Sequence, residues 1–255
     1  MRIATWNVNS LNVRLGRVEE WLEYARPDVL CLQETKLADA AFPYMPLEAR
    51  GYEAVHHGLG RWNGVAILSR VGIDDVVYGM PRAEATDPEE ARIVTATCGG
   101  VRVSSVYVPN GRGLLDDQYA YKLRWLADLR AFVTSGDPSE PRVVAGDFNI
   151  APADNDVAPG IVAETHTSAE VRGALHELLE WGMVDVFRRH HPTEPIFSWW
   201  DYRAGDFHKG RGLRIDLLLA TAPVADRTSF VLIDRQARKG KQPSDHAPLL
   251  MDADL

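Results

Sequence analysis

The sequence predicts an α/β fold with a large share of antiparallel sheet. Two amphipathic helices are expected at 13–24 and 118–133, and a third at 169–181. Short apolar runs fall between these helices in pairs and triplets, which argues against a strictly alternating doubly wound fold. The chain shows no linker, low-complexity tract or short-period repeat, so residues 1–255 are predicted to form one domain.

The first half of the chain is predicted to hold one helix and six strands. Residues 3–8 begin with a strand-like run, and the first helix stops at Pro27, whose ring cannot continue it. Residues 28–32 are a near-continuous apolar run, as expected for a buried strand. Gly99-Gly100 predicts a hairpin. The other strands expected here are 53–57, 64–68, 92–98 and 101–108.

The second half of the chain is predicted to hold two helices and five strands. The helix at 118–133 carries Tyr121, Trp125 and Leu129, and Ser168 suits the N-cap of the helix at 169–181. Residues 151–167 are expected to form a polar loop. The strands expected here are 142–148, 184–187, 214–220, 228–233 and 247–252.

The overall composition is that of an ordinary globular protein. The chain is 45% hydrophobic and 25% charged, and no apolar run approaches the length of a membrane span. Only two cysteines occur, Cys31 and Cys98, so reduced thiols in a cytoplasmic protein are expected. The formal net charge of −8 argues against a protein that coats nucleic acid non-specifically, but acidic metal ligands would contribute to such a charge.

The stretch Gly146-Asp147-Phe148-Asn149 ends the strand predicted at 142–148. Asp147 and Asn149 lie two residues apart, on one face of an extended chain. A carboxylate beside an amide suits a metal, a phosphate or an attacking water. The alternative is an Asx-turn in which both side chains satisfy only local backbone groups.

Polar residues also end the first, second and sixth predicted strands. Glu34 follows the apolar run 28–32 and offers a hard oxygen ligand of the kind that Mg²⁺ prefers. Asn7 could join that ligand set, or simply form another Asx-turn. Tyr107 and Asn110 end the strand at 101–108, and both can donate to a phosphoryl oxygen. A half-buried tyrosine beside a structural turn is the alternative.

Two further clusters lie near the C-terminus. Arg214 and Asp216 share one face of a strand, where an internal ion pair is the simplest interpretation. Asp245 and His246 follow Pro243 in a predicted loop. If Asp216 orients His246, it fixes the imidazole tautomer and stabilises its charged form. Together the clusters suit metal-assisted phosphoryl transfer, and no P-loop, nucleophile elbow or zinc-thiolate set competes with that interpretation.

Six motifs in one order resemble the exonuclease III family of AP endonucleases, within the endonuclease–exonuclease–phosphatase superfamily. The motifs are Trp6-Asn7-Val8-Asn9-Ser10, Gln33-Glu34-Thr35-Lys36, Tyr107-Val108-Pro109-Asn110-Gly111, Gly146-Asp147-Phe148-Asn149, Leu213-Arg214-Ile215-Asp216 and Ser244-Asp245-His246. The resemblance implies a four-layer α/β-sandwich of the deoxyribonuclease I type, with two mainly antiparallel sheets face to face and helices outside. The loops 39–52, 80–91 and 151–167 match less clearly.

The resemblance also implies roles for the matched residues. The implied divalent ion is Mg²⁺, with Mn²⁺ as an alternative. Its ligands would come from Glu34, with Asn7 and Asp245 close by, and from Asp147 and Asn149, which would position the attacking water. Tyr107 and Asn110 would hold the phosphate, and Asp216 and His246 would stabilise charge. Whether one or two metals bind, and whether Asp147 or His246 takes the water's proton, is left open, with Asp147 favoured.

The segment Phe197-Ser198-Trp199-Trp200-Asp201-Tyr202-Arg203 resembles the part of the family that borders the abasic-sugar pocket. Trp199 and Leu213 are the predicted walls, with Arg214 as a further substrate contact. An apolar pocket admits a sugar without a base and excludes an intact nucleotide. The alternative is that Trp199 is plain core.

The resemblance implies a DNA-repair phosphodiesterase that incises duplex DNA 5′ to abasic sites, with 3′→5′ exonuclease and 3′-end-cleaning activity. The expected partner is double-stranded DNA with abasic sites or blocked 3′ ends, and a monomer without membrane contact is expected. Two alternatives stay open: a phosphatase or phospholipase with the same fold, and a non-catalytic DNA-binding protein.

Overall fold

Two six-stranded sheets form the centre of the protein in a computed structural model that describes residues 1–83 and 89–255. The first sheet has the order β11-β12-β1-β2-β4-β3, and the second has the order β5-β6-β7-β8-β10-β9. The first sheet consists of β1 (Arg2–Asn7), β2 (Val29–Gln33), β3 (Glu53–His57), β4 (Val65–Ser69), β11 (Thr228–Ile233) and β12 (Leu249–Ala253). The second consists of β5 (Asp74–Tyr78), β6 (Ile93–Cys98), β7 (Val101–Tyr107), β8 (Arg142–Asp147), β9 (Met183–Asp185) and β10 (Asp216–Thr221).

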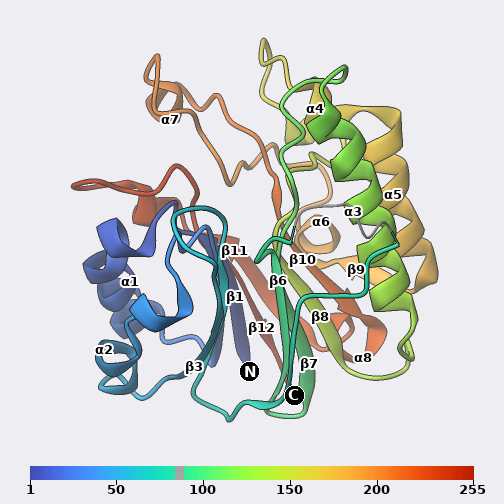
Figure 1. Ribbon diagram of the computed structural model, residues 1–255. Coiled ribbons are helices and arrows are strands. Elements are labelled where there is room, and N and C mark those ends of the chain that lie inside the picture. The colour runs from blue at the N-terminus through green and yellow to red at the C-terminus, as the bar shows by residue number, and fades with distance from the viewer. Residues whose placement is uncertain (84–88) are drawn as a thin grey trace.

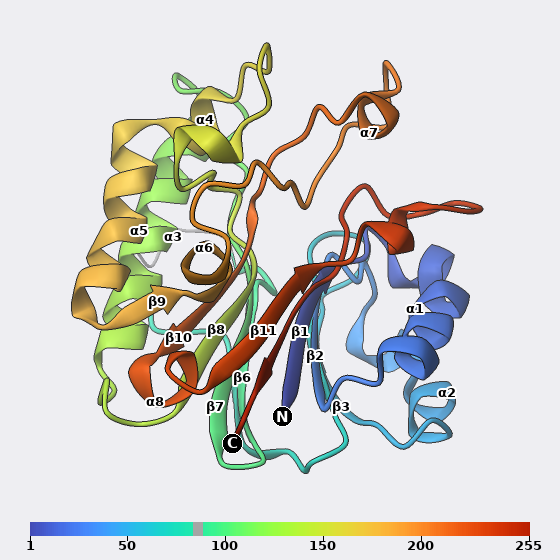
Figure 2. The same ribbon diagram turned by 180° about the vertical axis from the view of Figure 1, so that it is seen from behind.

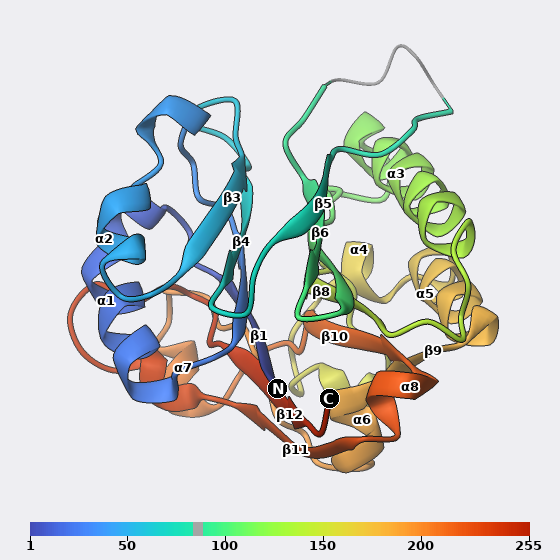
Figure 3. The ribbon, with the colours of Figure 1, turned by 90° about the horizontal axis from the view of Figure 1, so that it is seen from below.

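The sheets face each other and helices cover their outer sides, which gives four layers (Figure 1). The helices α1 (Leu11–Ala25) and α2 (Tyr44–Glu48) lie outside the first sheet, and α3 (Asp117–Thr134) and α5 (Ala169–Trp181) lie outside the second (Figures 1 and 3). The shorter helices are α4 (Glu164–Thr167), α6 (Val186–His190), α7 (Asp206–Lys209) and α8 (Ala222–Ala225), with 3₁₀ turns at Asp39–Ala41, Asp154–Asp156 and Arg235–Arg238. The predicted sandwich is therefore confirmed.

Three apolar clusters hold these layers together. The central one joins the inner faces of the sheets through residues such as Ile3, Val103 and Leu218. A second packs α3 and α5 on the second sheet, and a third packs α1 on the first. The alternation of side chains along each strand explains how one strand serves both the central and an outer cluster.

Each sheet contains one parallel pair, and this decides where the polar strand ends lie. β1 runs parallel to β2 with Asn7 opposite Gln33, and β7 runs parallel to β8 with Tyr107 opposite Asp147. Parallel strands end at the same edge of a sheet. The antiparallel strand β10 begins at this edge, because Asp216 is paired with Asp147. β12 also begins at this end of the sandwich and β11 ends there, because Leu249 is paired with both Thr5 and Ile233 (Figure 2).

Most predicted elements are present, and two differences have clear causes. Residues 184–187 were expected to be a strand, but the strand ends at Asp185 and Val186–His190 is helical. The Asp185 carboxylate accepts a hydrogen bond from the backbone N–H of Arg188 at 3.1 Å and so caps the helix. Four of the five residues of the edge strand β5 are exposed. The strand was missed because its apolar run, Val76-Val77-Tyr78, is only three residues long.

Two further observations bear on the sequence expectations. Within the described ranges 1–83 and 89–255, no helix is long and apolar enough to cross a membrane. Of the weakly matching loop 80–91, residues 84–88 lie outside the described residues.

Candidate active site

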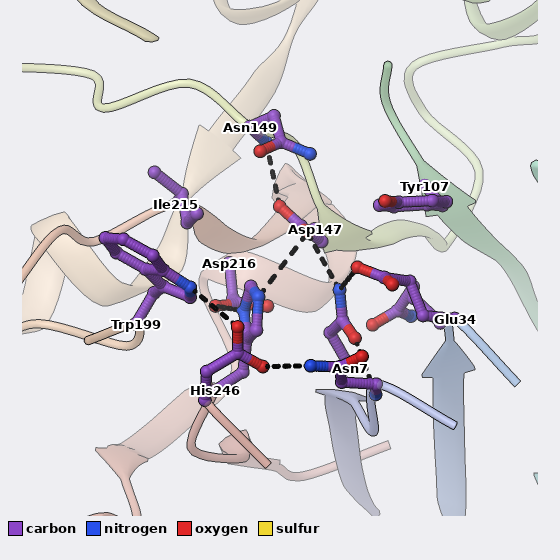
Figure 4. A network of polar contacts seen from close by, with 12 residues as sticks. Asn7, Glu34, Tyr107, Asp147, Asn149, Trp199, Ile215, Asp216 and His246 are labelled. Carbon is purple, nitrogen blue, oxygen red and sulfur yellow. Dashed lines mark hydrogen bonds and ion pairs between the residues drawn. The ribbon is translucent and has the colours of Figure 1, made fainter. Parts of the chain in front are cut away.

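The polar strand ends meet in a cavity of about 240 Å³ between the two sheets (Figure 4). Eleven residues line it: Glu34, Tyr107, Asn110, Asp147, Asn149, His166, Trp199, Leu213, Ile215, Asp245 and His246. Ten of them belong to the predicted motifs or pocket segment, so the structure brings distant parts of the chain together as the sequence indicated. Ile215 lies within one of these motifs without a predicted role, and His166 lies outside all of them.

Asn7 connects the two carboxylates at the centre of the cavity. Its side-chain nitrogen donates to Glu34 Oε1 and to Asp147 Oδ2, both at 2.9 Å (Figure 4). Its side-chain oxygen accepts from the backbone N–H of Asn9 at 2.9 Å. The Asx-turn alternative is therefore present at Asn7, but it uses only the oxygen and leaves the nitrogen for the site.

Asp147 likewise uses one side-chain atom in a local turn and another in the site. Its Oδ1 accepts from the backbone N–H of Asn149 at 2.9 Å, and its Oδ2 faces Asn7 and His246. Burial raises the pKa of the Asp147 carboxyl, and the negative charges of Asp216 and Glu34 add to this while His246 opposes it. A buried carboxylate with a raised pKa is suited to accept a proton.

Asp216 and His246 form a buried pair. His246 Nδ1 lies 2.8 Å from Asp216 Oδ2, and His246 Nε2 lies 3.7 Å from Asp147 Oδ2. Burial alone would lower the pKa of His246, but Asp216, Asp147 and Asp245 outweigh it and raise the pKa to about 10. Asp216 therefore does orient His246, as the sequence suggested, and holds the imidazole in its charged, donating form.

Asp245 joins this group through two neighbours. Its Oδ1 accepts from the Asn9 side-chain amide at 3.0 Å, and its Oδ2 accepts from the Trp199 indole at 3.1 Å. These bonds and the charge of His246 outweigh burial and lower the pKa of the Asp245 carboxyl. We call Asn7, Glu34, Asp147, Asp216, Asp245 and His246 the acidic wall.

A second group of residues around the cavity supplies amide and imidazole groups. The Asn110 side-chain nitrogen donates to Asn149 Oδ1 at 3.1 Å, and His166 Nε2 lies 3.1 Å from the same oxygen. Burial and the charge of Lys122 lower the pKa of His166 to about 3, so its imidazole is neutral. Lys122 donates to the backbone carbonyls that support these residues. We call Asn110, Asn149, His166 and Lys122 the amide wall.

Tyr107 lies between the two walls. Burial and the negative charge of Glu34 raise the pKa of the Tyr107 phenol well above its ordinary value. The phenol therefore stays protonated and is a hydrogen-bond donor. The Arg92 guanidinium stacks on the ring, 4.8 Å from its centre, and donates to the Tyr107 carbonyl at 3.3 Å. This contact fixes the ring beside Glu34.

Comparison with known proteins agrees with this geometry. Residues 4–246 match the model of the Endonuclease/Exonuclease/phosphatase family. An exodeoxyribonuclease III from Haemophilus influenzae is 35% identical over 98% of both chains, and a DNA repair nuclease APEX1 from Danio rerio is 30% identical over 98% of this chain and 81% of that protein.

This chain belongs to the endonuclease/exonuclease/phosphatase family.

Two solved structures are similar to this chain over its whole length. An AP endonuclease from Archaeoglobus fulgidus is 37% identical, with a TM-score of 0.95 and complete coverage of both chains. A 3′–5′ exonuclease, NExo, from Neisseria meningitidis is 40% identical, with a TM-score of 0.94 and complete coverage. The resemblance drawn from the six motifs is confirmed at the level of the family and the fold.

The acidic wall has the chemistry of a divalent-cation site of this family. Ligand atoms of Glu34, Asp147 and His246 lie within 4.8 Å of one another. A charged imidazole has no free lone pair, so His246 is unsuitable as a ligand while the two carboxylates are suitable. Mg²⁺ and Mn²⁺ prefer hard oxygen ligands, chiefly carboxylates and in some sites also the oxygen of a neighbouring amide. The residues present therefore fit a metal ion.

The structure separates the two predicted walls of the sugar pocket from the further predicted substrate contact, Arg214. Trp199 and Leu213 both line the cavity. Arg214 does not reach it, because its side chain has no exposed surface and its guanidinium pairs with Asp156 at 2.6 Å and Asp185 at 2.8 Å. A fully buried and paired guanidinium cannot contact a substrate in this conformation. The interpretation of Arg214 as a substrate contact is therefore wrong, and its role here is an internal ion cluster, although not with Asp216.

His166 and Lys122 are the site residues that the sequence analysis missed. His166 lies in the segment 151–167, which looked like an ordinary polar loop, so no pattern pointed to it. Lys122 carried a usable signal, because it lies three and four residues before Trp125 and Leu126 on the apolar side of α3. A lysine at that position is expected to snorkel to the surface, yet it is completely buried.

Proposed function

We propose that this protein is a divalent-metal-dependent DNA-repair hydrolase that cleaves phosphodiester bonds in damaged duplex DNA. The single observation that carries the proposal is the convergence of Glu34, Asp147 and the Asp216–His246 pair in one cavity. Full-length relatives named as an exodeoxyribonuclease III and a DNA repair nuclease support the choice of DNA as substrate. The same relatives argue against a phospholipase of the same fold.

We infer that Glu34 and Asp147 hold the metal ion, with Asn7, Asn149 and Asp245 close enough to adjust it. The ion is Mg²⁺, with Mn²⁺ as an alternative. When bound, a divalent ion neutralises developing negative charge on the phosphate oxygens. The other roles in the reaction belong to residues of the two walls and to Tyr107.

The attacking water lies beside Asp147 and Asn149 in our proposal. Asp147 takes a proton from that water as the water oxygen bonds to phosphorus. The bond from phosphorus to the 3′ oxygen of the leaving sugar breaks, and that oxygen takes up a proton from the solvent. The raised pKa of Asp147 suits this role. Asn149 orients the water. The charged His246, held by Asp216, donates to a phosphate oxygen and so stabilises the negative charge that accumulates there.

The phosphate itself is held by two further donors. Tyr107, which stays protonated, and the Asn110 amide both line the cavity. Donors that are already in place when charge develops need no reorganisation, and removing one such donor typically slows a reaction by about 10²- to 10³-fold. The product at the cleaved bond is a 3′-hydroxyl.

Two kinds of substrate fit the proposal, an internal abasic site and a blocked 3′ end, and the position of His166 bears on the choice between them. Incision 5′ to an abasic site requires room for the sugar between Trp199, Leu213 and Ile215. His166 lines the same cavity as these three residues, and we infer that its ring takes part of that room. This favours removal of groups from 3′ ends, where no flipped sugar is needed, over internal incision. A solved relative is a 3′ phosphatase, NExo from Neisseria, bound to a product DNA hairpin, and it is 41% identical to this chain.

Two matched duplexes test the proposal. One carries a 3′-phosphate at a nick, and the other carries an internal abasic analogue; each is incubated with Mg²⁺, with Mn²⁺ or with EDTA. We expect metal-dependent cleavage of both duplexes, faster on the 3′-phosphate. Binding of the duplexes without cleavage would show that the protein is only a DNA-binding protein. Hydrolysis of phosphoinositides while the DNA stays intact would show that it is a phospholipase instead.

The remaining expectations are a monomer and a cytoplasmic location. Cys31 and Cys98 are free and buried, as expected for a protein from a reducing compartment. Sedimentation of the purified protein checks the oligomeric state.

A further inference from the structure

Lys122 is a fully buried cation at the back of the amide wall. Its side chain has no exposed surface, and it is among the largest completely buried side chains of the described chain. Removing an ammonium group from water is very unfavourable unless hydrogen bonds and opposite charge compensate. A buried lysine therefore needs a reason in its immediate surroundings.

Three backbone carbonyls supply that compensation. Lys122 Nζ donates to the carbonyls of Asn149 and Thr165 at 2.7 Å and to that of Asn110 at 3.3 Å. An ammonium has three hydrogens, so each finds one acceptor. Burial lowers the pKa of Lys122 to about 7, while the charge of Asp147 opposes this. The three carbonyl acceptors also favour the charged form.

These carbonyls belong to three separate segments that carry the polar side chains of the cavity. Asn110 follows β7, Asn149 follows β8, and Thr165 immediately precedes His166 in α4. The side chains of Asn110, Asn149 and His166 contact one another within 3.3 Å. A single side chain of α3, that of Lys122, therefore contacts the backbone of all three segments.

The chain makes room for this side chain at Gly111. Gly111 has a φ of +92°, and a Cβ atom there would lie 3.2 Å from Lys122 Cδ and 3.3 Å from Tyr119 Cδ2. Neither contact leaves space for a larger residue without movement. The loop is therefore shaped around the path of the lysine.

We propose that Lys122 is a positioning residue for phosphodiester cleavage, because its ammonium fixes Asn110, Asn149 and His166 relative to one another. This role rests on the proposed function. Lys122 does not touch the substrate; it acts through the backbone of residues that face it. The competing explanation is that the lysine only stabilises the fold, and the two differ in what they predict for turnover.

Two variants separate these explanations. Lys122→Met keeps most of the volume and removes the three donors, and Arg142→Met removes another buried cation, at the opposite end of β8 from Asp147. For Lys122→Met we expect about 100-fold lower kcat at nearly unchanged KM, the scale typical of a displaced catalytic group. For Arg142→Met we expect a lower Tm but a kcat within about threefold of wild type. Both are measured well below their unfolding temperatures.

Chemical rescue then tests whether the ammonium itself is responsible. Lys122→Ala is assayed with n-propylammonium, which replaces the missing chain and its donors, and with tetramethylammonium at equal ionic strength, which has no N–H group. We expect at least about tenfold recovery of kcat with the first cation only. Equal effects of the two cations, or a Lys122→Met variant that keeps its kcat, would overturn the proposal.

A readout without turnover separates this proposal from the proposed function. The side-chain amide signals of Asn110 and Asn149 in ¹H–¹⁵N spectra are expected to shift and broaden in Lys122→Met, while the indole signal of Trp6 stays unchanged. If wild-type protein cleaves no DNA, the proposed function fails, and these signals still decide the positioning role. Unchanged amide signals would refute it.

Discussion

The two walls of the cavity are built in different ways. The acidic wall lies at the ends of strands, where the register of β1 with β2 and of β8 with β10 fixes its carboxylates. The amide wall lies on loops beyond the strands, and side-chain contacts such as those of Lys122 and His166 hold it together. Charge at this site is therefore set by the sheets, while the shape of the substrate space is set by loops and α3.

The two buried histidines express the same difference. Neighbouring carboxylates raise the pKa of His246 to about 10, and burial beside Lys122 lowers that of His166 to about 3. One ring is a charged donor and the other is neutral, although both line one cavity. We conclude that identical side chains acquire different chemistry from the wall to which they belong.

The largest expected effect comes from the centre of the acidic wall. Asp147→Asn keeps the size of the side chain but removes the proton acceptor, so kcat should fall by about 10³-fold or more, at the upper range for loss of a general base. The rate of 3′-phosphate removal is the measurement. Asp252→Asn, which breaks an ion pair with Arg2 at the far end of the first sheet, is the control and should keep its activity.

Normal turnover by Asp147→Asn would reject Asp147 as the base. If His246→Asn at the same time lost the pH dependence of the wild-type reaction, the base would be His246 instead.

A second change should affect metal binding in the acidic wall and leave the amide wall intact. Glu34→Gln removes a carboxylate ligand, and we expect about 10- to 100-fold weaker binding of Mn²⁺ in calorimetry, since changes at and around metal ligands have effects of this size. Glu53→Gln, on the exposed start of β3, should bind Mn²⁺ as wild type does. Unaltered binding by Glu34→Gln would remove Glu34 from the ligand set.

A third change should affect the amide wall alone. His166→Ser removes a ring from the cavity and should raise internal abasic incision relative to 3′-phosphate removal by about tenfold, which corresponds to about 1.4 kcal/mol between the two transition states. Paired assays on the two duplexes measure this ratio. His176→Ser, on the exposed side of α5, is the control. A constant ratio would show that His166 does not limit access for the sugar.

The smallest effects concern stability as a function of pH. The folded state lowers the pKa of His166, so its contribution is present above about pH 6.5 and is lost as pH falls towards 3. It raises the pKa of His246, so that contribution is present at low pH and is lost as pH rises towards 10. Each slope is at most about 1.4 kcal/mol per pH unit for one group.

Urea unfolding at several pH values, with EDTA present, measures both slopes. His166→Ser should flatten the acid side of the stability curve, and His246→Asn should flatten the alkaline side. If each variant changed both sides equally, the assignment of opposite protonation states to the two rings would be wrong.

The sequence predicted the acidic wall better than the amide wall, and the reason is physical. Strand ends can be located from apolar runs followed by polar residues, so Glu34, Asp147, Asp216 and His246 were all found. His166 sits on a short helix inside a loop without periodicity, so its position depends on tertiary contacts alone. The burial of Lys122 likewise depends on three carbonyls from distant segments, which no local pattern encodes.

The errors in the fold have the same origin. β5 is an exposed edge strand with only a short apolar run, and Val186-Phe187 entered a helix because Asp185 caps it. Arg214 lies two residues before Asp216, a pattern that fits a substrate contact as well as an internal ion pair. The tertiary structure places Asp156 and Asp185 beside the Arg214 guanidinium, and these two carboxylates neutralise its charge inside the protein.

Gly146 shows how an absent side chain can govern a reaction. It lies opposite Val106 in the parallel pair of β7 and β8, and a Cβ atom there would come within 1.9 Å of the Val106 carbonyl oxygen. Even a methyl group would wedge apart the strands that end in Tyr107 and Asp147. The lack of a side chain at Gly146 therefore sets the distance between the phenol and the carboxylate. The residue shapes the active site without contacting the substrate.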